Sequence, residues 1–185
     1  MEVESQILVD SVTKEIEHSS LALTLDIHSG FGTQDQIWFP YAKTQTPFPH
    51  LPHLHSLIEL FDKTFPHHFY RIEPQAENYT THGDLWDHIY DEQRRKNPQA
   101  TYLPICLEMG SWMWLKKNPL QIFLAEGPFN PIKKHREKRI LRRHYTFFDF
   151  LIKALSSESA WSVLNDEQTH KHLLRAKDRW YGKKK

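Results

Sequence analysis

The sequence predicts an α/β fold: a three-layer sandwich with a mixed, partly parallel sheet and a helical C-terminus. Two apolar runs, residues 21–27 and 101–107, have the length and composition of buried strands. Segments with helical periodicity separate these runs, and helices between successive strands are typical of sheets that are at least partly parallel. From Pro131 onward, the spacing of apolar residues is that of helices.

Helical and extended segments alternate along the first part of the chain. Apolar residues at three- to five-residue spacing predict an amphipathic helix over residues 3–17. Between residues 21 and 27, Leu and Ile alternate with smaller residues, as in a strand with much of both faces covered. A Pro-rich connection then leads into a helix near residues 54–64, and a short strand is expected around residues 68–72.

The second part of the chain continues the alternation and then becomes helical. Residues 83–95 have the pattern of a helix, which Asn97-Pro98 ends. Residues 101–107 form the second buried strand, and a last short helix is expected over residues 166–180.

Length and composition fit one globular domain. The chain has 185 residues, of which 39% are hydrophobic and 25% charged, and this excludes a disordered or fibrous protein. Residues 1–130 carry 9 Lys and Arg against 17 Asp and Glu, whereas residues 131–185 carry 15 against 6. We therefore expect an acidic α/β core over 1–130 and a basic helical extension of the same domain over 131–185.

Two features of the sequence favour a cytoplasmic protein. No apolar run approaches the roughly 20 residues of a membrane helix, and the acidic N-terminus differs from a basic signal peptide. No membrane partner is therefore expected. The single cysteine, Cys106, cannot form an intramolecular disulfide, which agrees with a reducing compartment.

Both predicted buried strands end on one functional side chain that small residues follow. His28 precedes Ser-Gly, and Glu108 precedes Met-Gly-Ser. Because ligands bind outside the carboxyl ends of strands in open α/β sheets, parallel strands would bring His28 and Glu108 to one cleft. Imidazole is a zinc ligand, and a carboxylate beside it can act as a general base. The alternative is that His28 caps a turn and Glu108 begins the next loop.

The segments around these residues resemble those of zinc carboxypeptidase-like metallopeptidases. The segment LDIHSGFG around His28 resembles the one that carries the third zinc ligand of that family, and LEMGS around Glu108 resembles the strand that carries its general base. The segment YTTHGDLWD, from Tyr79, is similar to the one with the mobile tyrosine that closes over the substrate. The resemblance covers roughly residues 5–130.

This resemblance implies a function and a set of roles. It implies zinc as the cofactor and His28 as a zinc ligand. It also implies Glu108 and Tyr79 as catalytic residues, and a peptide or an amino-acyl amide as the substrate. Trp112 and Trp114 follow Glu108 closely, and they are candidates either for lining a substrate pocket or for packing in the core.

The sequence also departs from the family. Its members hold zinc with three protein ligands, two of them from a His-x-x-Glu motif well upstream of the third, and this motif is absent before His28. The Asn-Arg pair that binds the terminal carboxylate of a substrate is absent as well. The resemblance is therefore to the C-terminal half of a catalytic domain, and the expected partners are the N-terminal half or a second copy of the chain.

Two further groups of residues have other interpretations. His50, His53 and His55 lie close together in the Pro-rich connection, and we expect them in a solvated loop rather than at a metal. The basic segment 133–143 can grip phosphates, although a solvated helix face is the default interpretation.

The sequence as a whole favours a zinc-dependent hydrolase of peptide or amide bonds, with a whole or partial catalytic domain. Because two of the three zinc ligands that the resemblance implies are absent, we expect this chain alone to bind zinc weakly and to be inactive. The competing hypothesis is a non-catalytic binding or interaction module that has lost its metal site. A nucleic-acid-binding protein with a basic tail ranks third.

Overall fold

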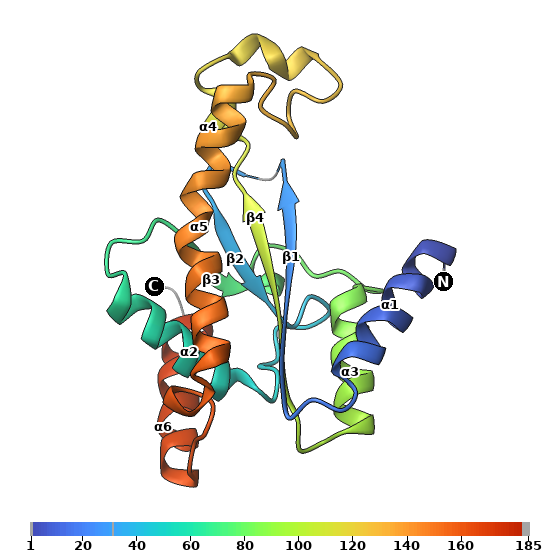
Figure 1. The fold of residues 1–185 in the computed structure, drawn as a ribbon, viewed down its shortest axis with the longest axis vertical. Coiled ribbons are helices and arrows are strands. Elements are labelled where there is room, and N and C mark those ends of the chain that lie inside the picture. Colours follow the sequence, from blue (N-terminus) through green and yellow to red (C-terminus); the bar gives the residue numbers. More distant parts are fainter. Residues whose placement is uncertain (1, 31, 183–185) are drawn as a thin grey trace.

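The computed structural model describes residues 2–30 and 32–182, and it has a mixed sheet with helices on both sides (Figure 1). Four strands form the sheet in the order β1-β4-β2-β3: β1 (Leu21–Ser29), β2 (Gln36–Phe39), β3 (Arg71–Pro74) and β4 (Thr101–Met109). β1 runs parallel to β4, whereas β2 runs antiparallel to β4 and parallel to β3. The predicted α/β class and the mixed, partly parallel sheet are confirmed.

Six α-helices accompany this sheet in the described residues. They are α1 (Val3–Ile16), α2 (Leu51–Thr64), α3 (Leu85–Lys96), α4 (Trp112–Leu115), α5 (Lys134–Ser156) and α6 (Asp166–Ala176). Short 3₁₀ turns lie at Gln75–Glu77, Pro119–Phe123 and Glu158–Ala160, and a π-helical turn at Lys177–Tyr181 follows α6. In Figure 1, α1 and α3 lie on one side of the sheet, and α2, α5 and α6 lie on the other. No helix of the described residues is long and apolar enough to cross a membrane.

The side chains of β4 alternate between two different environments, because successive residues of a strand point to opposite faces. Tyr102 stacks on Tyr90 of α3 with ring centroids 6.2 Å apart, so the even-numbered residues of β4 face α3. The odd-numbered residues Leu103, Ile105 and Leu107 face the other way and are fully buried. One face of the sheet therefore belongs to the hydrophobic core, and the other is only partly covered.

Aromatic residues join the helices of the core side to one another. Phe61 of α2 packs against Phe147 and Phe150 of α5, with ring centroids 5.3 and 4.9 Å apart. Phe39 of β2 packs against Trp180, which follows α6, at 4.8 Å. These contacts bury one face of α5 under the sheet, as the apolar periodicity after Pro131 predicts.

Part of the basic extension pairs with the acidic core. Arg175 of α6 bonds to Glu59 of α2 at 2.7 Å, and Arg179 bonds to Asp62 at 2.6 Å. These ion pairs support the contact between α2 and α6. Other Lys and Arg residues, at the N-terminal end of α5, line a basic groove that is described below.

The strand β2 is an element that the sequence did not predict. It has only four residues, yet it lies between β4 and β3 and is buried throughout. β3 begins three residues later than expected, because the N–H of His68 bonds to the carbonyl of Phe65 and prolongs the turn after α2.

The expectation of a solvated histidine-rich loop is wrong. α2 begins at Leu51, earlier than predicted, with Pro52 in its first turn, where the missing N–H of proline costs no hydrogen bond. This places His50 and His55 at the buried side of the helix, with 8% and 5% of their surfaces exposed. Nδ1 of His55 lies 2.8 Å from Nδ1 of His172 on α6, so these histidines belong to the contact between the two helices.

Candidate active site

The parallel register of β1 and β4 brings four functional side chains together. Asp26 lies opposite Cys106, and His28 lies opposite Glu108. Because the two residues in each strand are two positions apart, all four point to the same face of the sheet, the one that α3 partly covers. The pattern at the two strand ends predicts this meeting of His28 and Glu108, whereas their chemical roles stay predictions.

A cleft of about 470 Å³ opens over these four side chains. His28, Tyr79 and Glu108, the three residues selected from the sequence for zinc binding and catalysis, all line it. Trp38 of β2 and Trp86 of α3 form part of its walls. His28 and Glu108, which are 80 positions apart along the chain, therefore share one cleft that also contains aromatic side chains.

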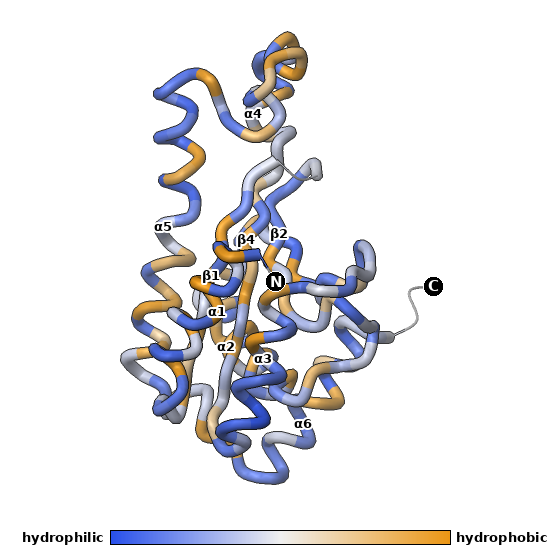
Figure 2. Tube along the Cα trace, turned by 90° about the vertical axis from the view of Figure 1, so that its right-hand side faces the viewer, coloured by the Kyte–Doolittle hydropathy of each residue, from blue (hydrophilic) through white to orange (hydrophobic). Residues whose placement is uncertain are grey.

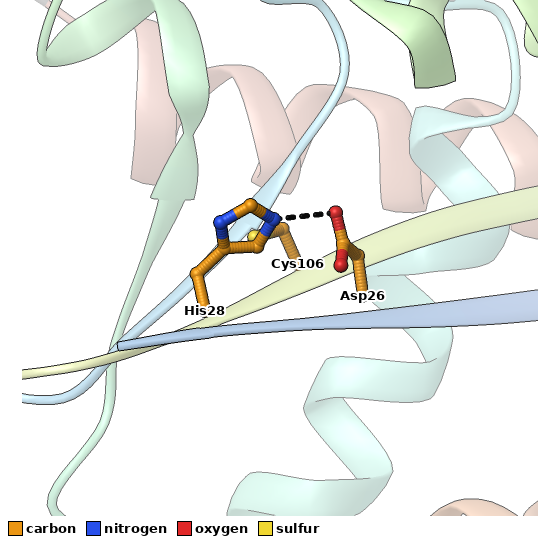
Figure 3. A group of neighbouring side chains, drawn as sticks. All are labelled: Asp26, His28 and Cys106. Carbon is orange, nitrogen blue, oxygen red and sulfur yellow. Dashed lines mark hydrogen bonds and ion pairs between the residues drawn. The ribbon is translucent and has the colours of Figure 1, made fainter. Parts of the chain in front are cut away.

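Asp26 holds the imidazole of His28 in place. Its Oδ2 lies 2.7 Å from Nε2 of His28 (Figure 3). The same oxygen accepts a 2.7 Å hydrogen bond from Nε1 of Trp86. A carboxylate accepts hydrogen bonds, so the proton between the two residues belongs to Nε2 of His28. This hydrogen bond fixes the orientation of the imidazole ring.

The same carboxylate controls the charge of His28. Burial alone lowers the pKa of an imidazole, but the hydrogen bond and the negative charge of Asp26 outweigh this effect. Glu108 and Asp84 add to it, and the pKa of His28 is raised above its ordinary value.

Glu108 and Tyr79 have pKa values that suit proton transfer and hydrogen-bond donation. Burial raises the pKa of Glu108, and Asp26 raises it further, although His28 opposes both. A carboxyl with a raised pKa is a better proton acceptor near neutral pH. Burial and the nearby Glu108 also raise the pKa of Tyr79, so its hydroxyl stays protonated and can donate a hydrogen bond.

Asp26, His28 and Cys106 form a group that can hold a metal ion. One nitrogen, one carboxylate oxygen and one sulfur of these residues lie within 4.8 Å of one another. These are the three donor types that zinc binds in proteins. Burial and the carboxylate of Glu108 raise the pKa of the Cys106 thiol, so a metal would have to displace its proton, which weakens binding at neutral pH.

The two tryptophans of the sequence prediction lie outside this cleft. Trp112 and Trp114 are not among the described residues that line it. Trp114 is buried and donates a 3.1 Å hydrogen bond from Nε1 to the carbonyl of Gly127, whereas half of the surface of Trp112 is exposed. For Trp114 this contact agrees with the packing role that the sequence left open.

Asp26 and Cys106 are the residues of the site that the sequence interpretation missed. Each lies two residues before a selected residue, in the patterns Asp-x-His and Cys-x-Glu. When the strands pair in parallel at this register, Asp26 lies beside Cys106 and His28 lies beside Glu108, so the four side chains form one group. The signal was present in the spacing, but it becomes visible only when the register is known.

Comparisons of the chain with protein-family models, with curated proteins and with solved structures found no match.

Proposed function

We propose that the protein is a zinc-dependent hydrolase of peptide or amide bonds and that the cleft between β1, β4 and α3 is its active site. One observation carries this proposal: His28, the predicted zinc ligand, and Tyr79 and Glu108, the predicted catalytic residues, are distant in sequence, and all three line one cleft. The pKa directions of Glu108 and Tyr79 suit the roles assigned to them.

The donor atoms of Asp26, His28 and Cys106 fit zinc. An ion held by all three residues would take the place of the proton between Nε2 of His28 and Oδ2 of Asp26. Zinc, when bound, polarises a carbonyl group and lowers the pKa of water towards about 7.

The residues of the chain itself would do the remaining work. Glu108 would accept a proton from the attacking water as the water oxygen bonds to the carbonyl carbon, and would deliver that proton to the leaving amine as the C–N bond breaks. Burial, the main cause of its raised pKa, makes its carboxylate a better proton acceptor. Tyr79 lies at the rim, with 47% of its surface exposed, and donates a hydrogen bond to the substrate. The rings of Trp38 and Tyr79 pack edge-on, with centroids 6.0 Å apart, and this contact supports the tyrosine.

The test combines zinc binding with hydrolysis. We expect one weak zinc site by calorimetry, which His28→Ala weakens at least tenfold, in line with the loss of a metal ligand or its support. The sequence alone predicts an inactive chain, but Asp26 and Cys106 add two donors to His28, so with zinc in excess the chain should release amines from N-acyl amino acids or short peptides. Glu108→Gln should lower this rate about 10² to 10⁴-fold, the usual contribution of a general base. Glu15→Gln, at an exposed position of α1, is the matched control and should change neither quantity.

Each outcome decides between hydrolase and binding module. Hydrolysis that is independent of Glu108, or zinc that binds equally well without His28, would refute the assignment of this cleft. Zinc binding that depends on His28 without any hydrolysis would refute the catalytic part of the proposal, and the absence of both zinc binding and hydrolysis would favour the non-catalytic module that has lost its metal site.

A further inference from the structure

An apolar tip projects from the end of the molecule opposite α6, over the 3₁₀ turn Pro119–Phe123 and the residue after it (Figures 1 and 2). Four apolar side chains in five consecutive residues point to solvent, which is unusual for a short turn. Their exposed fractions are 75% for Leu120, 52% for Ile122, 83% for Phe123 and 55% for Leu124.

The tip is folded with its polar residue inside and its apolar residues outside. Gln121 is only 2% exposed, and its Nε2 donates to the carbonyl of Gly127 at 2.9 Å. Trp114 donates to the same carbonyl. A Cβ on Gly127 would lie 1.5 Å from the carbonyl oxygen of Gln121, so the tight turn requires this glycine. Internal hydrogen bonds therefore hold the apolar side chains outward.

A basic groove of about 570 Å³ lies beside the tip, between α4 and the N-terminal part of α5. Phe69, Met113 and Ile140 line it, and its other lining residues are all Lys, Arg or His, with no acidic residue among those described. These six residues are Lys116, Lys117, His135, Arg136, Arg139 and Arg143.

Two of the arginines hold the groove together. Arg143 bonds to the buried carboxylate of Asp35 at 2.9 Å and stacks over the ring of Phe69 at 3.9 Å. Arg136 of α5 donates to the carbonyl of Lys117 at 3.3 Å, which joins α5 to the residues after α4.

The remaining cations of the groove are available to a partner. Lys116, Lys117 and Arg139 form no ion pair with any residue that the structure describes. Residues 112–143 as a whole contain nine Lys and Arg against two Glu, a net charge of +7. The α6 side of the molecule, where Arg175 and Arg179 pair with acids, offers no such excess.

We propose that the tip and the groove together dock the protein on the surface of an anionic lipid bilayer. Apolar side chains that enter the headgroup region, with Lys and Arg beside them, are the features of proteins that bind membranes peripherally. Nucleic acid would account for the cations of the groove but leave the apolar tip in water. This proposal departs from the expectation of no membrane partner, which rested on spanning helices and signal peptides and did not consider docking at the bilayer surface.

Cosedimentation of the full chain with vesicles tests this proposal. We expect binding to vesicles of phosphatidylcholine mixed with phosphatidylserine, little binding to phosphatidylcholine alone, and weaker binding at high salt. Lys116→Gln with Lys117→Gln should weaken the binding about thirtyfold, from roughly 1 kcal/mol for each lysine. Leu120→Ser with Phe123→Ser should weaken it about tenfold or more, because both side chains leave the headgroup region.

Matched controls use residues with similar exposure elsewhere. Val163→Ser removes an apolar side chain that is 69% exposed, and Lys14→Gln removes an exposed charge on α1. Neither should change vesicle binding. Equal binding to neutral and anionic vesicles, or binding that both double variants leave intact, would overturn the proposal. So would binding to duplex DNA without any binding to vesicles, or a dimer that Phe123→Ser dissociates in the absence of vesicle binding.

Discussion

Leu107 and Glu108 are neighbours in β4, yet they lie in two different environments. Leu107 is fully buried on the core face, between sheet and helices, whereas Glu108 lies at the floor of the cleft on the face towards α3. The alternation of a strand therefore places the residue that stabilises the fold and the residue that would perform chemistry side by side. The difference shows that the cleft depends on incomplete cover of one face, since a fully packed face would exclude a substrate.

Histidines show the same contrast between the two sides. Burial and the neighbouring His172 lower the pKa of His55 to about 4 on the core side. On the cleft side burial also disfavours the charged form of His28, but Asp26 reverses the direction and the pKa is raised. The carboxylate of Asp26 thus reverses the direction in which burial alone would move the pKa of His28.

The largest expected effect comes from truncating the core face of β4. Leu107→Ala should lower the free energy of unfolding by about 2 to 5 kcal/mol, because it leaves a cavity in a packed core. Ile27→Ala is the matched control: Ile27 pairs with Leu107 in the register and shares its face, but it is 48% exposed at the edge strand β1. Its truncation should cost about 1 kcal/mol or less.

Urea denaturation of both variants measures these costs. Equal costs would contradict the contrast between core and edge. They would mean that another surface covers Ile27 in solution, as the expectation of a second copy of the chain requires, and light scattering would then show a mass above that of the monomer.

A smaller change in stability is expected from protonation of His55, which lies at the contact between α2 and α6. A base with a lowered pKa in the folded state takes up its proton more readily in the unfolded state, so its protonation favours unfolding. For His55 the loss of stability begins as the pH falls below its ordinary value of 6.5 and is complete below about 4. We expect a loss of order 1 to 2 kcal/mol over this range, allowing for partial solvent screening.

The variant His55→Gln separates the contribution of His55 from those of other titratable groups. His55→Gln should flatten the dependence of stability on pH between 6.5 and 4, whereas His18→Gln, at a highly exposed position, should leave it unchanged. Hydrogen exchange should locate the loss, with faster exchange in α6 than in β4 at pH 5. Uniform acceleration in both elements would contradict a local effect on the contact between α2 and α6.

Local patterns predicted the long elements of the fold well. Residues 3–17 were expected as a helix and Val3–Ile16 form one, since periodicity over several turns is a strong signal. The four-residue strand β2 is not predicted, because four residues are too few to show the period of a helix or of a strand. Only the pairing with β4 and β3 makes them a strand. The Pro-rich composition around Pro52 predicts a loop, although a proline in the first turn also begins helices.

Two residues of the candidate site, His28 and Glu108, are predictable from their own positions in the sequence. His28 and Glu108 stand at the ends of apolar runs, and this position directs them to the same edge of a parallel pair. Asp26 and Cys106 matter through their partners on the neighbouring strand and on α3, and such partners depend on register and packing rather than on local sequence. The roles of all four residues depend on the experiments proposed above.

The smallest predicted change in the free energy of unfolding comes from substitution of Glu108. This substitution should stabilise the protein, whereas Leu107→Ala should destabilise it. An acid with a raised pKa in the folded state destabilises the fold once the pH exceeds its ordinary value of 4.5, because the folded state must give up a proton that it holds more tightly. The penalty is absent below pH 4.5 and complete above the raised pKa. Glu108→Gln should therefore stabilise the protein at pH 7 by about 0.5 to 1 kcal/mol, and the gain should vanish at pH 4.

Thermal unfolding of both proteins at the two pH values measures this gain. Glu15→Gln, at an exposed position of α1, serves as the control and should show none at either pH. A loss of stability in Glu108→Gln at pH 7 would mean that the carboxylate contributes a favourable interaction to the folded state, and Glu108 would then be a structural residue of the cleft. A gain at pH 7 together with lost hydrolysis would show that the fold gives up stability at this position in order to keep a proton acceptor in the cleft.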